Sequence, residues 1–448
     1  MYRTLILLTC FVFVVCLVGN PLARAATRTW DNEGGDNRWD TAANWSNDRI
    51  PGGSADHARI VLTDADECLI DSLVSAEPAN VFVGYQGAAG DLRMTGGSFT
   101  PNNTHIGRDS VGRFILSDGV MNSTNLMHVG DDPGGVGTFT MSGGTANLGD
   151  NADIDWKTLY IGRDGATGTV TISGGELHAG TVNVGNALGG VGTLVISGGT
   201  VSTGDIGNTN ALNVANSGAT GTATISGGVI NVSGFLNVGN GRNVTDDLVT
   251  ASNGLLEMLG GTINIGFADT GLDWRDLRIG HNEGTGVVNM SGGTININGG
   301  IIVGSTNIQT IEDPFEEILH PGTGSLTMTG GLISAADANA LEIGTNESTG
   351  WVDLLGGTIM VGDLVIGADG GMNITEGTLV LKGDDMRTIL DYIDAGQLTA
   401  YGGWSGAEWQ YDYNVRNAGQ TTVTAIPEPA TVALLTFGAL VLLRRRKR

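Results

Sequence analysis

The chain contains 448 residues, among them 74 glycines, and carries a formal net charge of −25 at pH 7. Charged residues make up 15% and hydrophobic residues 40% of the sequence, a composition that excludes a highly charged disordered chain. The segments 1–25 and 428–448 hold seven basic residues and one acidic residue, so the body between them is more acidic still. Because such a body repels phosphates, we expect no nucleic-acid partner.

The N-terminal segment 1–25 has the features of a secretory signal peptide. Arg3 supplies a positive charge, and residues 5–18 form an apolar core. Ala23 and Ala25 form a small-x-small cleavage site. An uncleaved membrane anchor is the alternative, but 14 apolar residues are few for a bilayer span. We therefore expect the chain to be exported.

Cysteine is nearly absent. Cys10 and Cys16 lie in the apolar core of the signal peptide, which leaves Cys68 as the third and last cysteine. No intrachain disulfide is possible after cleavage of the signal peptide. We expect Cys68 to be a buried, unreactive thiol.

Residues 26–78 differ in composition from the repetitive part of the chain and contain Trp30, Trp39 and Trp45. The stretch 30–60 (WDNEGGDNRWDTAANWSNDRIPGGSADHARI) resembles the opening of large exported bacterial proteins with autotransporter-like β-solenoids. In those proteins this segment begins the solenoid. Tryptophans are suited to covering the open strand edges of a first coil, so we predict an N-terminal cap. An aromatic platform that binds sugar is the alternative.

A short phrase recurs along the middle of the chain, as in GTVTISGG at 168–175. Further copies begin at Gly137, Gly192, Gly221, Gly286 and Gly324. A second phrase, apolar-x-apolar-Gly, precedes each copy and ends once in alanine. Its last residues are Gly84, Gly107, Gly130, Gly162, Gly185, Ala215, Gly239, Gly280, Gly304, Gly344 and Gly367. Six of the ten intervals between them are 23 or 24 residues, a period that predicts a stacked array of coils with occasional insertions.

Within the repeat the apolar residues alternate with period 2, which predicts strands. Phe139 and Met141 share one face, and the threonines between them share the other. The equivalent inward positions are Val170, Ile172, Leu194, Ile196, Ala223, Ile225, Val288, Met290, Leu326 and Met328. Three short strands joined at glycine corners fit one repeat. We predict an all-β, single-stranded, right-handed parallel β-helix of about 11 coils over residues 79–377, roughly 50 Å long at ~4.8 Å a coil.

The insertions are the most individual parts of the solenoid. Two share a phrase that places Trp156 and Trp274 at equivalent positions, which indicates copying of a block of coils. Several are acidic, namely at Asp131, Asp132, Asp150, Asp153, Asp155, Asp246, Asp247, Glu312, Asp313, Glu316 and Glu317. Calcium favours clustered carboxylates, but no stretch matches an EF-hand loop or a glycine–aspartate nonapeptide. We expect solvated acidic loops.

No catalytic constellation stands out. The histidines, at positions 57, 105, 128, 178, 281 and 320, show no metal-type pairing, and we expect ordinary surface or corner residues. Basic residues are sparse in the coils, although lyase chemistry needs cations and hydrolysis needs opposed carboxylates. We predict a non-enzymatic protein with no cofactor and no metal site. A polysaccharide lyase or hydrolase of the same fold is the alternative.

Threonine is frequent at the outward positions of the repeat. These positions hold Thr138, Thr140, Thr169, Thr171, Thr193, Thr222, Thr224, Ser325 and Thr327. Stacked, they would form a ladder on a flat face, similar to faces of β-solenoids that bind ice or regular polymers. Threonine is also simply a good strand residue, and Val195, Val287 and Asn289 interrupt the ladder.

The sequence pattern of residues 378–425 predicts a C-terminal cap. The stretch 384–393 indicates a short amphipathic helix, capped by Asp384 or Asp385 and ended by Gly396. A strand is expected at 421–425. We interpret the two tryptophans of this segment, at positions 404 and 409, as packing residues.

The last 23 residues, 426–448, contain Pro427-Glu428-Pro429 and then an apolar run over 430–443. A basic cluster, Arg444, Arg445, Arg446, Lys447 and Arg448, ends the chain. This order resembles the PEP-CTERM sorting tail, which implies processing by an exosortase near the tripeptide and delivery to the surface or the extracellular polysaccharide matrix. Residues 426–443 would form ~27 Å of helix, nearly a bilayer core, with the basic end in the cytoplasm. We therefore predict a C-terminal transmembrane helix.

Taken together, the sequence predicts an exported surface or matrix protein with a structural or adhesive role, anchored in the membrane transiently or permanently. Its expected partners are an exosortase, the membrane and extracellular polysaccharide. The alternatives are a polysaccharide-active enzyme and a protein that binds ice or glycan surfaces.

Overall fold

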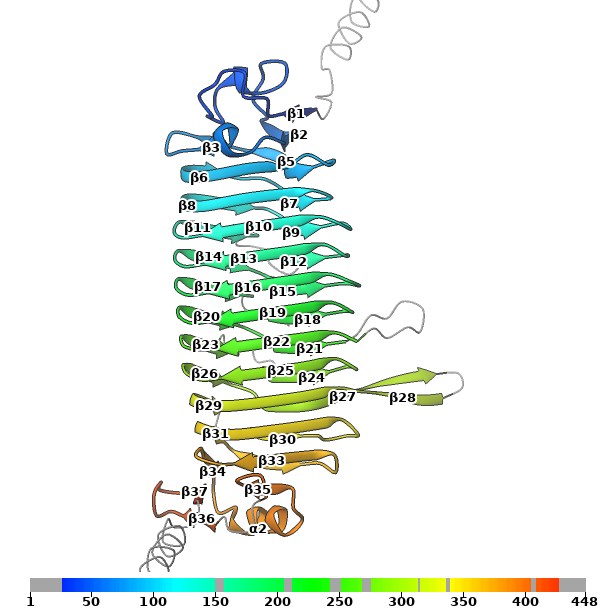
Figure 1. The fold of residues 1–448 in the computed structure, drawn as a ribbon, viewed down its shortest axis with the longest axis vertical. Coiled ribbons are helices and arrows are strands. Elements are labelled where there is room, and N and C mark those ends of the chain that lie inside the picture. The colour runs from blue at the N-terminus through cyan, green and yellow to red at the C-terminus, as the bar shows by residue number, and fades with distance from the viewer. Residues whose placement is uncertain are drawn as a thin grey trace, which may run out of the picture.

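The computed structural model describes residues 26–149, 157–204, 212–241, 251–267, 275–312, 315–335, 339–403 and 408–426. These residues form a straight stack of coils, with the N-terminal cap at one end and the C-terminal cap at the other (Figure 1). Nearly every coil contributes three short strands. Equivalent strands of successive coils pair in parallel, so the predicted parallel β-solenoid is confirmed in its strand pattern.

The first strands of the coils form one long sheet, here called the first column. Its members, in spatial order, are β1 (Thr27–Thr29), β2 (Gly53–Ile60), β5 (Pro78–Tyr85), β7 (Asn103–Arg108), β9 (Met127–Asp131), β12 (Thr158–Arg163), β15 (Thr181–Asn186), β18 (Leu212–Asn216), β21 (Leu236–Asn240), β24 (Leu277–His281), β27 (Ile301–Glu312), β30 (Ala340–Ile343) and β32 (Asp363–Ile366). The eleven strands from β5 to β32 are those that the repeated glycine or alanine marks in the sequence.

The second column holds the strand that opens each copy of the recurrent phrase. Its members are β3 (Cys68–Ile70), β6 (Gly90–Phe99), β8 (Val111–Ser123), β10 (Val136–Met141), β13 (Thr167–Ile172), β16 (Val191–Ile196), β19 (Thr220–Ile225), β22 (Asn253–Met258), β25 (Thr285–Met290), β29 (Thr323–Ala335), β31 (Thr349–Val361), β33 (Gly370–Ile374) and β35 (Leu398–Ala400). In β22 the phrase takes the form GLLEMLGG, at 254–261, and keeps its two buried inward residues, Leu256 and Met258.

The third column follows the Gly-Gly corner. It contains β4 (Ser75–Ala76), β11 (Thr145–Leu148), β14 (Glu176–Ala179), β17 (Thr200–Thr203), β20 (Val229–Val232), β23 (Thr262–Ile265), β26 (Thr294–Ile297) and β34 (Thr378–Lys382), and the long strands β6, β8, β29 and β31 run on into it. The inward positions predicted for the second column are all buried, and they form one continuous core with the inward side chains of the other two columns.

The corner glycine of the first column explains why the coils stack so closely. Gly130 has φ +75°, and a Cβ placed on it would lie 2.2 Å from the backbone oxygen of Thr167 in the next coil. A left-handed conformation and a neighbouring carbonyl both disfavour a side chain at Gly130. Ala215 occupies this position in one coil, with φ +64°.

Three tryptophans close the N-terminal end. Trp30, Trp39 and Trp45 are each 1% exposed, and Trp45 packs edge-on against the other two at 5.0 and 4.7 Å between ring centroids. Two short 3₁₀ turns, Ala42–Asn44 and Asp64–Asp66, support them. The packing interpretation is confirmed, and the sugar-platform alternative is wrong because no ring face is open to a ligand.

The strands of residues 53–76 extend the stack beyond the repeats recognised in the sequence, because β2 pairs with β5, and β3 and β4 pair with β6. Cys68 lies in β3 and is fully buried, as expected. Burial raises the pKa of its thiol well above the ordinary value, so the group is unreactive.

The opposite end is closed by helix α2 (Met386–Asp394) and an antiparallel pair, β36 (Glu408–Tyr413) and β37 (Gln420–Ile426), with β37 laid against β34. Helix and terminal strand are thus confirmed, and Gly396 follows the helix with φ +72°. The predicted side-chain cap is wrong: Asp385 occupies the N-cap, but its side chain makes no capping hydrogen bond. Trp409 packs against the core, and position 404 lies outside the described residues.

One insertion forms a side arm. Strand β27 continues past its coil and pairs antiparallel with β28 (Phe315–Pro321), and this hairpin projects from the stack (Figure 1). The insertions that contain Trp156 and Trp274 lie outside the described residues. Within the described ranges, no helix is long and apolar enough to cross a membrane. The predicted transmembrane segment and the signal peptide, with Ala23 and Ala25, lie outside those ranges.

Candidate functional site

An unbroken stack of rings runs along the outward face of the first column. It consists of Phe82, His105, His128 and Tyr160, which we call the aromatic column. Successive ring centroids are 5.0, 4.8 and 5.1 Å apart, and the interplanar angles are 14°, 12° and 26°. Each ring precedes its corner glycine by two residues, so parallel in-register pairing places the rings one above another.

Farther along the rod, asparagines replace the rings at the same outward position. Asn183, Asn213 and Asn237 continue the line as a buried amide ladder, with Nδ2 to Oδ1 hydrogen bonds of 2.8 and 2.7 Å. Asn213 and Asn237 each donate to the amide oxygen of the coil before, which satisfies polar groups that burial would otherwise penalise. This part of the line is structural.

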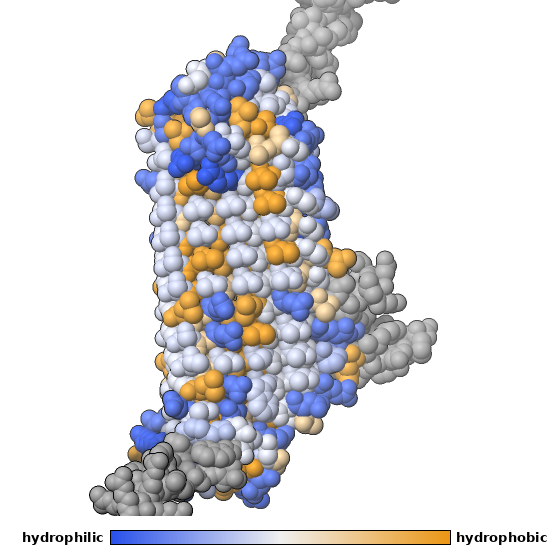
Figure 2. Space-filling view, in the orientation of Figure 1, coloured by the Kyte–Doolittle hydropathy of each residue, from blue (hydrophilic) through white to orange (hydrophobic). Residues whose placement is uncertain are grey.

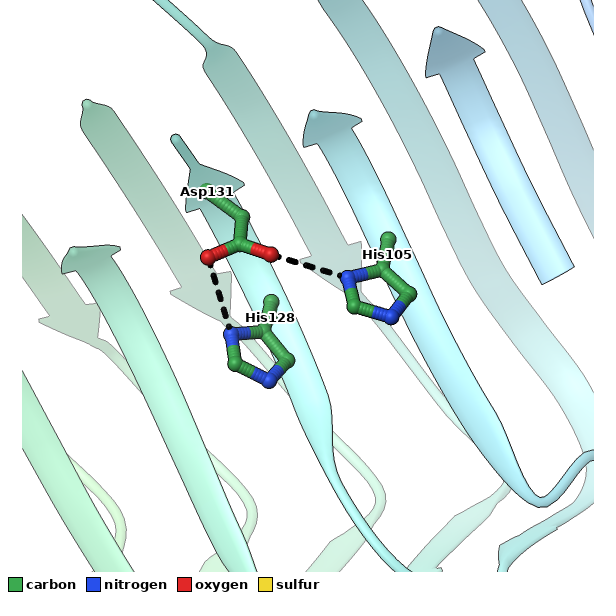
Figure 3. Close-up of side chains that lie close together, drawn as sticks. All are labelled: His105, His128 and Asp131. Carbon is green, nitrogen blue, oxygen red and sulfur yellow. Dashed lines mark hydrogen bonds and ion pairs between the residues drawn. The ribbon is translucent and has the colours of Figure 1, made fainter. Parts of the chain in front are cut away.

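Asp131 joins two rings of the aromatic column to form a cluster of three titratable groups, here called the His–His–Asp cluster (Figure 3). The carboxylate lies at the end of β9, one residue after the left-handed Gly130, which turns the chain there. Its Oδ2 is 3.0 Å from His105 Nδ1, and its Oδ1 is 3.3 Å from His128 Nδ1. The three groups are contributed by two successive coils.

Burial makes this cluster unusual. The side chains of His105, His128 and Asp131 are 14%, 3% and 6% exposed. Since an ionised carboxylate only accepts hydrogen bonds, the Nδ1 of His105 is the donor to Asp131. Nδ1 of His128 is within ion-pair distance of the carboxylate but makes no hydrogen bond of acceptable geometry. A buried polar atom without a hydrogen bond is uncommon in native proteins and calls for an explanation.

The electrostatics of the cluster favour a charged Asp131. Burial by itself raises the pKa of Asp131, but the hydrogen bond from His105 and the nearby ring of His128 outweigh it, so the pKa lies well below the usual range. Burial lowers the pKa of His105, and the contact with Asp131 opposes this shift only in part. The cluster therefore combines a carboxylate anion with a neutral His105 imidazole at physiological pH.

Two arginines border the cluster, and each has its own carboxylate. Arg108 Nε is 2.8 Å from Asp132, and Arg163 Nε is 3.0 Å from Asp164. Arg163 approaches Asp131 only to 4.0 Å. Each arginine thus has a closer carboxylate partner than Asp131, whose nearest side-chain partners are His105 and His128.

The sequence-based expectation for these residues was partly wrong. His105 and His128 are not scattered surface residues, because one 23-residue repeat separates them and their strands pair in register. That separation is the signal that identifies them. Asp131 is 4% exposed and is therefore no solvated loop residue. His178 is nearly half exposed, as expected for an ordinary surface residue.

The other acidic insertions give less information. Asp132 is the ion-pair partner of Arg108 at 2.8 Å. The remaining acidic positions, at 150, 153, 155, 246, 247 and 313, lie outside the described residues, and the side chains at 312, 316 and 317 are not described either.

A second surface feature lies on the outward face of the second column. Thr138, Thr169, Thr193 and Thr222 pair in register over four coils, as expected, and Leu255 then ends the ladder. Farther along, the same face holds a shallow depression of about 220 Å³. It is lined by Glu257, Leu259, Asn289, Met290, Ser291, Thr327 and Thr329.

Comparison with known proteins identifies the tail. No curated protein and no solved structure matches this chain. A family model described as the PEP-CTERM protein-sorting motif matches residues 425–448. The match includes Pro427, Glu428, Pro429 and the basic cluster 444–448, which lie outside the described residues. The chain therefore carries a PEP-CTERM protein-sorting motif, which implies export, processing by exosortase and sorting toward the cell surface.

Proposed function

We propose that this protein is a non-catalytic structural or adhesive rod that contacts extracellular polysaccharide at the cell surface or in the matrix. One observation carries the proposal: a continuous stack of coils, capped at both ends, leads directly into a sorting motif that begins within its last strand. The tail, with its apolar run over 430–443, holds the chain in the membrane until exosortase acts.

The outward face of the second column suits a long polar polymer. Glu257, Asn289 and Thr327 occupy equivalent positions on three successive coils and line the shallow depression. Carboxylate, amide and hydroxyl groups at strand spacing, ~4.8 Å, supply hydrogen-bonding partners for sugar hydroxyls. Figure 2 shows one long face of the rod as rows of side chains of mostly intermediate hydropathy, with separate hydrophobic and hydrophilic patches among them.

Arginine–carboxylate pairs also lie along the second column. Arg113 binds Asp91 through two hydrogen bonds of 3.2 and 2.8 Å, and Arg93 binds Glu67 at 2.7 Å. These pairs join neighbouring coils, and each cation is held by its own anion. The depression lies elsewhere and contains one carboxylate, Glu257, whereas glycoside hydrolysis needs two.

The location is tested by intact-mass measurement and fractionation in the native host. We expect a mature chain that lacks residues 1–25 and the segment after about 427, recovered from the surface or matrix fraction. Recovery of a chain that retains 430–448 in the inner membrane would contradict sorting, and the rod would then be a tethered domain.

The contact face is tested by co-sedimentation of the chain with the host's own exopolysaccharide. We expect a double variant, Glu257→Ala with Asn289→Ala, to bind at least about 10-fold more weakly than the unchanged chain. Glu176→Ala, which removes an exposed carboxylate from the third column, serves as the control. Equal binding by all three chains would exclude this face.

The in-register threonine ladder favours one alternative, adhesion to a flat regular surface such as ice or a crystalline glycan. Thr169→Val and Thr193→Val keep side-chain shape and remove the hydroxyls. If the ladder is the binding face, both substitutions together abolish ice-recrystallisation inhibition or pelleting with insoluble glycan; a chain inactive in both assays before substitution rules the alternative out.

A further inference from the structure

We propose that His105, His128 and Asp131 bind one divalent transition-metal ion, such as Zn²⁺, which joins two successive coils of the rod. The three side chains place their potential ligand atoms within 4.8 Å of one another. Two imidazole nitrogens and one carboxylate oxygen are a donor set that suits zinc and its neighbours, whereas magnesium and calcium prefer oxygen alone.

The distances match a coordination site that closes on binding. Ligand atoms about 2.0–2.1 Å from a tetrahedral ion are roughly 3.3 Å apart. Each imidazole nitrogen already lies at about this distance from one oxygen of Asp131, His105 Nδ1 at 3.0 Å from Oδ2 and His128 Nδ1 at 3.3 Å from Oδ1. With one oxygen of Asp131 as the ligand, the remaining separations, which are at most 4.8 Å, must shorten by up to about 1.5 Å, a movement within the range of side-chain rotation.

Burial and charge support the ion. His128 is 2% exposed, and its Nδ1 points to the carboxylate without completing a hydrogen bond (Figure 3). An ion at this point would satisfy that atom and offset the buried negative charge of Asp131. When the metal takes the Nδ1 lone pair of His105, Nδ1 gives up its proton and Nε2 takes one up, so the ring stays neutral in the Nε2–H tautomer. Three protein ligands leave a fourth position for water.

A metal ion at this place would link two coils that no disulfide joins. Within residues 26–448 the chain has one cysteine, so no disulfide joins its coils. A metal bound by β7 and β9 ties neighbouring coils by contacts that the backbone pairing alone does not provide. Outside the cell, where disulfides usually perform this task, the ion would stabilise the first coils after the N-terminal cap.

The test uses the full-length chain in detergent, stripped with a chelator and then titrated with Zn²⁺ alone, with Ca²⁺ and Mg²⁺ as comparison ions. We expect one Zn²⁺ per chain, a higher midpoint of thermal unfolding on zinc addition, and no response to the other two ions. Titration with Co²⁺ should give visible absorption bands typical of tetrahedral coordination.

Two variants separate ligand loss from misfolding. His105→Phe keeps the ring stack, because Phe82 already occupies the equivalent position one coil earlier, and Asp131→Asn keeps the shape of the carboxylate. Each should weaken zinc binding at least about 10-fold, the lower end of what removing a supporting group costs. His178→Asn, at an exposed histidine on β14, should bind as the unchanged chain does.

Three results would overturn the proposal: no stoichiometric zinc on the unchanged chain, equal binding by both cluster variants, or loss of binding in His178→Asn alone. Circular dichroism of each variant establishes that its strands are intact. Because location and glycan binding are measured without added metal, failure of the zinc site leaves the surface role standing, and the converse also holds.

Discussion

The corner position of the first column permits an unusually direct test of the fold. Gly185 and Ala215 occupy this position in adjacent coils, with φ +75° and φ +64°. A Cβ added at Gly185 would lie 2.2 Å from the backbone oxygen of Thr220. We predict that Gly185→Ala is strongly destabilising, whereas the reverse substitution, Ala215→Gly, is nearly neutral.

The magnitudes follow from two separate costs. A left-handed conformation costs an alanine about 1–2 kcal/mol, and overlap with a rigid backbone adds about 1–3 kcal/mol, so Gly185→Ala should lose roughly 2–5 kcal/mol of unfolding free energy. For Ala215→Gly, relief of the left-handed cost is offset by about 0.5–1 kcal/mol of backbone entropy and about 0.8 kcal/mol of lost burial, which leaves a change below ~1 kcal/mol.

Gly189→Ala separates the two costs. Gly189 also has φ +75°, but the nearest atom to a Cβ there, the Cα of Gly165, is 3.6 Å away. This substitution carries the conformational cost alone, about 1–2 kcal/mol. The difference between Gly185→Ala and Gly189→Ala therefore measures the overlap with Thr220.

Urea unfolding of the purified chain, followed by circular dichroism, gives the free energies, and hydrogen exchange shows which coils open. In a stacked array each coil depends on its neighbours, so protection should fall first in β15 and β19. The reasoning would be refuted if Gly185→Ala cost less than ~1 kcal/mol, or no more than Gly189→Ala.

Three further predictions concern the two ends of the chain. Trp45→Ala removes the central ring of the N-terminal cap and should cost about 3–5 kcal/mol, seen as faster proteolysis within residues 26–78; an unchanged digestion pattern would contradict a packing role. Cys68 should resist a maleimide reagent even at mildly alkaline pH, because burial raises its thiol pKa, and should react once the chain unfolds; rapid labelling of the native chain would show that the cap is open. Deletion of residues 427–448 should leave the rod folded but release it from the sorting route, so that fractionation finds it in the periplasm or medium; unchanged surface retention would mean that the tail does not direct sorting.

Much of the architecture could be predicted because each sequence repeat corresponds to one coil of the solenoid. Alternation in residues such as Phe139 and Met141 identifies strands and their inward faces, and the 23-residue period identifies the coil. The side arm of β27 and β28 could not be foreseen, because an insertion of that length is compatible with many structures and its pairing depends on residues outside the repeat.

The candidate metal cluster was missed for a physical reason. Metal motifs are usually sought at short spacings along one helix or turn, whereas a solenoid brings together residues one coil apart. His105 and His128 fit this rule once the period is known. Asp131 does not follow from the period alone, because its approach to the rings depends on the left-handed turn at Gly130.

The number of stacked coils also determines how far apart the two ends of the rod lie. The first column contains strands from β1 to β32 in unbroken succession, and Ile426, the last described residue, belongs to the cap at the far end. At about 4.8 Å a strand, the tryptophan cap stands roughly 60 Å from the point where the sorting segment begins. Each added or deleted coil of 23 or 24 residues would change this distance by one strand spacing and leave both ends intact. The number of coils therefore acts as a molecular ruler that determines how far the tip of the protein extends from its place of attachment.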